Sequence, residues 1–73
     1  MIFKQIFVWV KFEPGEELKA YVINIDLKAA AETDDIDMFV AKSTVRHSNL
    51  RNAIVVYNKY TKEDAVEDLL KCN

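Results

Sequence analysis

Glycine, proline, cysteine and histidine each occur only once in the 73 residues of this chain, and their scarcity excludes most catalytic and cofactor sites. Phosphate-binding loops of the Walker and dinucleotide types need several glycines, so a single glycine rules them out. It also rules out the G-x-S-x-G motif of the serine hydrolases. One histidine and one cysteine are too few for the usual zinc sites. We therefore expect no enzymatic activity, no metal and no cofactor.

The single cysteine, Cys72, leaves no pair that could form a disulfide within the chain. Small domains in oxidising compartments usually depend on disulfides, so we expect this domain in a reducing compartment, the cytoplasm. Cys72 and His47 would form the only nucleophilic dyad available, but nothing in the sequence places them together. We expect Cys72 to be an inert terminal thiol. His47 is expected at the end of a helix, where the helix dipole favours its charged form.

Long hydrophobic runs and a strong excess of one charge are also missing. The longest apolar run, residues 6–10, is far below the ~20 residues that span a bilayer, so we expect neither a membrane span nor a signal peptide. The net charge is −2 and the pI is about 5.3, so no basic excess indicates a nucleic-acid partner. The carboxylates of residues 32–37 lack the glycine-bearing turn of calcium loops, and an acidic helix start explains them.

What the chain does contain is enough apolar residues, 51%, for one small folded domain that spans residues 1–73. A domain of this size buries only about 60% of the surface that its unfolded chain exposes. Its core therefore supplies on the order of 3–5 kcal/mol of stability. Association with another protein or with a second copy would add to that stability.

The most informative stretch is FKQIFVWV, residues 3–10, because both of its faces are apolar. Successive side chains of a β-strand point to opposite faces of the sheet. One face carries the aliphatic side chains of Ile6, Val8 and Val10, and the other carries aromatic rings. These rings belong to Phe3, Phe7 and Trp9. The aliphatic face is expected to pack on a core, which leaves open what covers the aromatic face.

Two further strands are predicted. Residues 18–27 alternate like the first strand, and the turn residues Pro14 and Gly15 lie between the two, which predicts a β-hairpin. A Pro-Gly pair fits the centre of a type II turn, whose twist does not suit a two-residue hairpin, so we expect a longer loop. Residues 52–60 are rich in β-branched and aromatic side chains and predict the third strand.

Two helices complete the predicted order, ββαβα. The first is expected to begin at an N-cap Thr33 and to end within residues 48–49, although the three preceding alanines allow an earlier start. The second begins at Thr61, which has the spacing of a capping box with Asp64. The most apolar strand belongs in the centre. We therefore predict an α+β domain, a three-stranded antiparallel sheet of order 2-1-3 with two helices packed mainly on one face.

With the helices on the aliphatic face, the aromatic face is left as an exposed apolar patch. Such patches usually mark interfaces, and Trp and Tyr are enriched among the residues that dominate binding. The expected partner-binding residues are Phe7, Trp9, Lys11, Val22, Val55, Tyr57 and Lys59. The alternative is that the second helix folds onto this side, which would make Phe7 and Trp9 ordinary core residues.

Two classes of function follow. The first is a non-enzymatic protein-binding module that binds another protein or a second copy of itself: an inhibitor, an adaptor, an antitoxin-like or phage-inhibitor-like neutralising protein, or a self-associating subunit. The second is a single-stranded RNA- or DNA-binding module that stacks bases on Phe7, Trp9 and Tyr57. The negative net charge and the scattered lysines make nucleic acid the less favoured partner.

Overall fold

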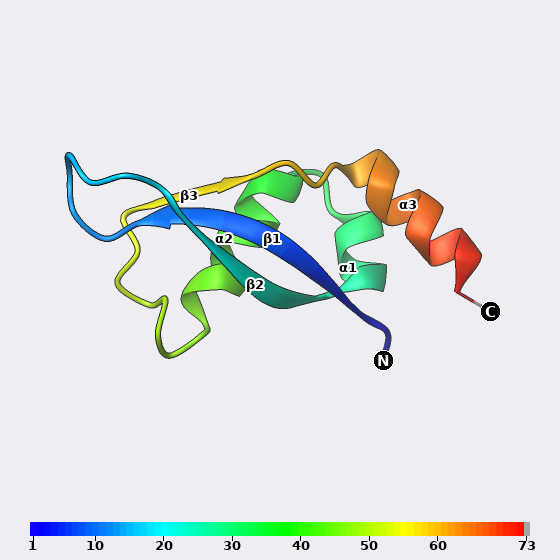
Figure 1. Cartoon of the computed structure of the whole chain (residues 1–73). Helices are drawn as coiled ribbons and strands as arrows, with labels where there is room; N and C mark the ends of the chain where they lie inside the picture. Colours follow the sequence, from blue (N-terminus) through cyan, green and yellow to red (C-terminus); the bar gives the residue numbers. More distant parts are fainter. Residues whose placement is uncertain (73) are drawn as a thin grey trace.

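The computed structural model describes residues 1–72 and shows the three-stranded antiparallel sheet and the ββαβα order that the sequence predicts (Figure 1). The strands are β1 (Phe3–Lys11), β2 (Lys19–Asp26) and β3 (Val55–Asn58). Both other strands pair with β1 in antiparallel fashion, so the order is β2-β1-β3. The most apolar strand therefore lies in the centre of the sheet, as expected.

The segment expected as one helix is two short helices, α1 (Leu27–Glu32) and α2 (Ile36–Val45). The prediction of Thr33 as the N-cap was wrong. Thr33 is the C-cap of α1, and its hydroxyl accepts a hydrogen bond of 3.2 Å from the Asp35 N–H. Asp35 is the N-cap of α2, and its carboxylate accepts a hydrogen bond of 3.1 Å from the Met38 N–H. Aspartate caps a helix at least as well as threonine, so the second helix starts at the later residue.

The ends of two elements also differ from the prediction. Helix α2 ends at Val45, before residues 48–49, and His47 lies in the turn that follows, where its N–H donates to the Thr44 carbonyl at 3.1 Å. Strand β3 has four residues rather than the expected nine, because the chain that precedes it is still in a turn-rich loop. Leu50 of that loop is 2% exposed, so the loop contributes to the core.

The loop between β1 and β2 is longer than two residues, as expected, and is held by Glu16. Gly15 has a φ of +88°, and the Glu16 N–H bonds to the Glu13 carbonyl at 3.4 Å, which fits the predicted turn. The Glu16 carboxylate accepts hydrogen bonds from the N–H groups of Phe12 and Glu13. These bonds, the one from Phe12 above all, lower the pKa of Glu16.

Helix α3 (Lys62–Lys71) begins with the capping box that the sequence predicts. The Thr61 hydroxyl accepts a hydrogen bond from the Asp64 N–H at 3.0 Å, and the Asp64 carboxylate accepts one from the Thr61 N–H at 3.1 Å. Two backbone donors that the first turn leaves unpaired are satisfied in this way.

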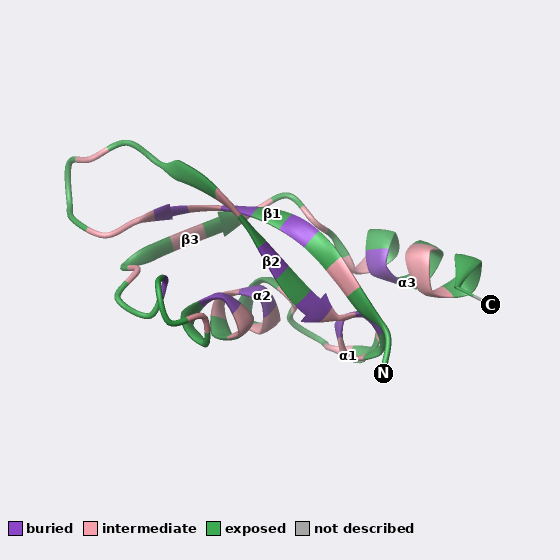
Figure 2. Cartoon of the chain, turned by 60° about the horizontal axis from the view of Figure 1, so that its bottom comes forward, coloured by how far each residue is buried: buried purple, intermediate pink, exposed green. Residues whose placement is uncertain are grey.

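All three helices contribute to a core on one face of the sheet. Figure 2 shows α1 and α2 against this face, with α3 at the end of the sheet, and buried residues alternate with more exposed ones along β1. The buried aliphatic side chains are Ile6, Val8, Val10, Ile23, Ile25, Leu27, Ala30, Val40, Leu50 and Ala65. Helix α3 packs against α1 rather than on the aromatic face. The alternative that made the aromatic side chains ordinary core is therefore wrong.

The domain is elongated, with extents of 42 × 20 × 18 Å. Its accessible surface is 5161 Å², whereas a compact monomer of 8.5 kDa is expected to expose about 4,700 Å². The extra surface reflects a single sheet whose second face has no covering layer. A domain with this shape has a thin core and a large apolar surface in contact with water.

The capping box of α3 gives a test of the fold. Thr61→Ala removes the hydroxyl acceptor, and we expect a loss of about 1 kcal/mol of stability, or roughly 4–8 °C in Tm. Thr61→Ser keeps the acceptor and is the matched control, which should melt close to the wild type. Thermal unfolding followed by circular dichroism measures both. Equal melting temperatures of the alanine variant and the wild type would contradict the observed cap.

Candidate binding surface on the sheet

The sheet register brings six of the seven predicted partner-binding residues onto one surface, and Lys59, which follows β3, lies over the Trp9 ring on the same surface. Across the β1–β2 ladder, Phe7 lies opposite Val22. Across the β1–β3 ladder, Trp9 lies opposite Tyr57 and Lys11 lies opposite Val55. We call the sheet surface that the helices leave uncovered the open face; by strand alternation it consists of Phe3, Gln5, Phe7, Trp9, Lys11, Ala20, Val22, Asn24, Val55, Tyr57 and Lys59.

Large apolar side chains of the open face are exposed to an unusual degree. Phe7 is 61% exposed, Tyr57 50% and Val22 49%, whereas the aliphatic side chains on the opposite face of β1 are almost completely buried. Trp9 is half-buried, because neighbours on both flanking strands pack against its large ring. The open face is thus an apolar surface with a partly supported aromatic residue at its centre.

The aromatic rings of the open face form a row across the sheet. The ring centroids of Phe7 and Trp9 are 6.3 Å apart, and those of Trp9 and Tyr57 are 6.1 Å apart, with tilted planes in both pairs. The Lys59 ammonium lies 5.2 Å from the centroid of the Trp9 ring, within range of a cation–π interaction. These contacts restrict the orientations that the three rings can adopt.

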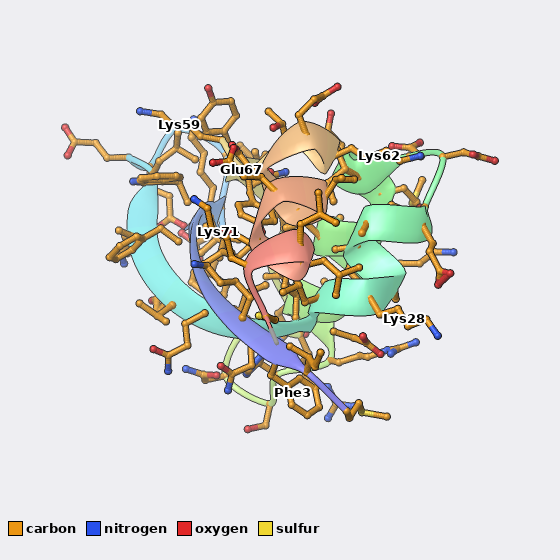
Figure 3. The ribbon with its side chains drawn as sticks, turned by 90° about the vertical axis from the view of Figure 1, so that its right-hand side faces the viewer. Phe3, Lys28, Lys59, Lys62, Glu67 and Lys71 are labelled. Atoms are coloured by element: carbon orange, nitrogen blue, oxygen red, sulfur yellow. The ribbon has the colours of Figure 1, made fainter. Side chains whose placement is uncertain are left out.

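The charged side chains of the open face are lysines. Lys11 lies at one end of β1, and Lys59 follows β3 beside the aromatic row. Asp26, at the border, uses its carboxylate as the N-cap of α1, where it accepts a hydrogen bond of 3.3 Å from the Ala29 N–H. Figure 3 looks at the α3 end of the molecule and shows Lys59 on the side of the sheet, with Lys28 on the side of α1. The face is therefore apolar, with two lysines and one helix-capping aspartate at its border.

A shallow hollow of about 280 Å³ continues the open face toward α3. Its lining includes Phe7, Trp9 and Lys59 together with Tyr60 and Asp64, which the sequence did not assign to the site. The alternation of β1 places Gln5 on this surface, but the contributions of Tyr60 and Asp64 depend on where α3 packs. No local sequence signal gives that position, so these two residues were missed.

A small polar network fixes α3 beside the hollow. The Tyr60 hydroxyl donates a hydrogen bond of 2.5 Å to the Asp68 carboxylate, and the Lys4 ammonium lies 3.6 Å from the same oxygen. The bond from Tyr60 lowers the pKa of Asp68, and the charge of Lys4 adds to this effect. Burial and the bond to Asp68 raise the pKa of Tyr60. The network links β1 to α3 across the sequence and sets the wall of the hollow.

Neither the Cys72 thiol nor the His47 imidazole lies in the open face. Cys72 is exposed just after α3, and His47 lines a separate hollow between β2 and the two helices α1 and α2, which does not include Cys72. Within residues 1–72, no three side chains of the His, Cys, Asp and Glu types come together as a potential metal site. The open face itself combines exposed apolar side chains with Lys11 and Lys59.

In the part of the chain that the structure describes, no helix combines the length and the apolar character needed to cross a membrane.

No protein-family model matches the chain, and neither the curated proteins nor the solved structures include one with significant similarity to it. What the open face can do is therefore argued from its own geometry and chemistry.

The network at the hollow predicts a characteristic pH dependence of stability. Tyr60→Phe should lose about 1–2 kcal/mol near pH 7, toward the lower value because both groups are partly exposed. The pKa of Asp68 is lowered in the folded protein. The stabilisation that depends on its charged form is therefore present above the ordinary value of 3.8 and is lost as the pH falls through the folded-state pKa. The pKa of Tyr60 is raised in the folded protein. The stabilisation that depends on its protonated hydroxyl is therefore present below the ordinary value of 10.0 and is lost as the pH rises through the folded-state pKa.

The free energy of unfolding in urea, measured for both proteins across this pH range, tests the prediction. The difference between them should be largest in the neutral range and should shrink at both extremes. Tyr21→Phe is the matched control, because no bond from its hydroxyl occurs within residues 1–72. A difference between wild type and Tyr60→Phe that stays constant from acid to alkali would contradict the network.

Proposed function

We propose that this chain is a non-enzymatic protein-binding module of the inhibitor or adaptor kind and that the open face is its binding surface. The observation that supports this most directly is the exposed aromatic row of Phe7, Trp9 and Tyr57, held in a fixed arrangement on a rigid sheet. Contiguous apolar surfaces of this kind on small domains mark interaction sites. The half-buried Trp9 at the centre has the position and chemistry of a binding hot spot.

The free energy of covering apolar surface also supports a binding role for the open face. Apolar surface removed from water contributes about 25 cal/mol per Å², so covering the open face would supply several kcal/mol to a complex. The exposed part of this surface adds little to the stability of the isolated domain, because the buried aliphatic core lies on the other face of the sheet. Retaining three aromatic side chains in water is explained if a partner covers them.

The charges of the open face favour a partner that is apolar and carries carboxylates. Lys11 and Lys59 would meet such groups at the edge of the contact, where they steer association and add specificity. Stacking two copies face to face would bring lysines toward lysines, which is unfavourable. A different protein is therefore the better occupant of the open face.

We also propose a cytoplasmic location. Cys72 is a free and exposed thiol, which is more compatible with a reducing compartment than with an oxidising one.

A second candidate function, single-strand nucleic-acid binding, is favoured by one specific observation. The aromatic row with Lys59 beside Trp9 has the chemistry of a base-stacking platform. The chain as a whole carries 12 acidic and 10 basic residues, however, and the affinity of such platforms depends strongly on a positive field around the phosphates. Protein binding remains the preferred function.

Titration with fluorescent oligonucleotides separates the two candidates. We expect weak binding without sequence preference at moderate salt, because two lysines neutralise few phosphates. Affinity in the sub-micromolar range with a steep salt dependence would reverse the ranking and make nucleic acid the partner.

The protein-binding function is tested by capture of partners from native lysate, with and without nuclease, followed by titration with the purified partner. Phe7→Ser and Trp9→Ala should weaken binding by about 2 kcal/mol or more, roughly 30-fold in Kd, because both remove apolar contact from the interface. Leu70→Ser is the matched control, since Leu70 is 74% exposed on α3, away from the open face. Binding should also shift the emission of Trp9, the only tryptophan, to shorter wavelength.

Circular dichroism shows whether each variant is still folded, so that a loss of binding can be distinguished from unfolding. Trp9 is half-buried, so its replacement by alanine should cost less than the ~3–5 kcal/mol of a fully buried tryptophan, and Phe7→Ser should cost less still. Folded Phe7→Ser and Trp9→Ala variants that bind the partner as tightly as the Leu70→Ser control would contradict the proposal. Loss of partner capture from the lysate after nuclease treatment would also contradict it.

A further inference from the structure

A second hollow, of about 400 Å³, lies where α1 and α2 pack against β2. Figure 2 shows the end of β2 beside these two helices. We call it the β2 hollow; its lining includes Phe3, Asp26, Phe39, Arg46 and His47. Its volume is in the range of small-molecule sites in proteins. No ring of the aromatic row lines it, so what binds here is a separate question from what covers the open face.

The β2 hollow has a half-buried floor and an exposed rim. Asp26, Phe39 and His47 are half-buried, whereas Phe3 and Arg46 are exposed. Two aromatic rings, Phe3 from β1 and Phe39 from α2, provide apolar walls. Phe39 also packs against the core of the domain, so the fold fixes its position. An apolar group placed between these walls would be removed from water, which is favourable.

Opposite charges line the β2 hollow without neutralising each other. Arg46, the C-cap of α2, brings a guanidinium, and Asp26, the N-cap of α1, brings a carboxylate. Within residues 1–72, neither takes part in an ion pair of 4.0 Å or less. The Asp26 Oδ1 accepts the hydrogen bond from the Ala29 N–H at 3.3 Å, and in the same part of the chain its Oδ2 accepts none. The hollow therefore offers one cation and one anion, each able to bind a further group.

His47 adds a further nitrogen donor beside Arg46. Its backbone is held in the turn after α2, because its N–H donates to the Thr44 carbonyl at 3.1 Å and its carbonyl accepts from the Leu50 N–H at 3.0 Å. Its half-buried imidazole lines the hollow. An imidazole carries at least one N–H donor, and a guanidinium carries five in a planar fork that suits a carboxylate. Arg46 and His47 together therefore favour a carboxylate at their end of the hollow.

We propose that the β2 hollow binds a small zwitterion with an apolar body, a free α-amino acid whose side chain is aromatic or a large aliphatic group. Arg46 and His47 bind its carboxylate, and Asp26 binds its ammonium group. The rings of Phe3 and Phe39 contact its side chain. Each of these groups lines the same hollow, so one small molecule can reach all of them.

Ligands with a single charge fit the β2 hollow less well. A carboxylic acid without an ammonium group would bind Arg46 but would bring a second negative charge close to Asp26. An amine without a carboxylate would bind Asp26 but would bring a second positive charge close to Arg46. Charges that lose water without gaining a partner are unfavourable. A molecule that carries both charges pairs with both groups.

Titration of the isotope-labelled chain with three probes, followed by NMR, tests the proposal. L-phenylalanine carries both charges, 3-phenylpropionate lacks the ammonium group, and phenethylamine lacks the carboxylate, while all three have the same ring. Phenylalanine should shift the amide signals of residues around the β2 hollow. Its affinity should exceed that of each single-charge probe by about tenfold or more, because each of them loses a hydrogen bond to a charged group.

Two substitutions assign the two ends of the ligand. Asp26→Asn removes the charge but keeps an N-cap acceptor for α1, so the variant should stay folded. It should weaken phenylalanine about tenfold and bind 3-phenylpropionate at least as well as the wild type does. Arg46→Gln, at an exposed position, should weaken phenylalanine to a similar extent and spare phenethylamine. Asp34→Asn and Arg51→Gln are the matched controls, because both residues are exposed and lie outside the hollow.

Three outcomes would overturn the proposal. Amide signals that do not move with phenylalanine up to its solubility limit exclude the site. Equal affinities for phenylalanine and 3-phenylpropionate would show that Asp26 does not bind the ammonium group and that the ligand is not a zwitterion. Equal affinities of Arg46→Gln and Arg51→Gln for phenylalanine would place its binding outside the hollow. The Phe7→Ser variant, which tests partner binding at the open face, should bind phenylalanine as the wild type does, so the two functions can fail independently.

Discussion

The antiparallel pairing of β1 with both of its neighbours is the interaction on which the rest of the structure depends. Because β1 lies in the centre, its strict alternation determines what each face of the sheet becomes: aliphatic side chains from Ile6 to Val10 build the core, and the rings of Phe7 and Trp9 lie on the other side. Both ladders then place side chains of the same character beside those of β1 on each face. The layer of helices, the core and the open face are consequences of this one arrangement.

The sequence was sufficient to predict the sheet because the relevant information is local. Alternation in β1 and β2, one Pro-Gly turn and the density of β-branched residues near Val55 are short-range signals that located the strands. The expectation that the most apolar strand lies in the centre then gave the strand order. The capping box of Thr61 and Asp64 was also readable, since both of its hydrogen bonds lie within one turn.

Two kinds of feature were not predictable in the same way: the choice between two nearby N-cap residues, and contacts between residues far apart in the sequence. Thr33 and Asp35 are both good N-caps by residue type, but in the structure Thr33 ends α1 and Asp35 begins α2, so the helical segment is broken between them. The Tyr60 hydroxyl reaches Asp68 eight residues later, and Lys4 approaches the same carboxylate from the other end of the chain. Their meeting depends on where α3 lies, which periodicity alone does not determine.

The distance in sequence between β1 and β3 has a consequence for how the chain folds during synthesis. The β1–β2 hairpin is closed by a short loop held by Glu16, so it can form as soon as residue 26 has left the ribosome. The other edge of β1 must wait until Val55–Asn58 has been made, and local contacts form much faster than distant ones. In that interval the most apolar strand of the chain has one open edge, with Lys4 and Lys11 near its two ends. Lys4 meets its partner Asp68 only after α3 has also been made, so the edge of β1 and the end of the domain are completed late in synthesis.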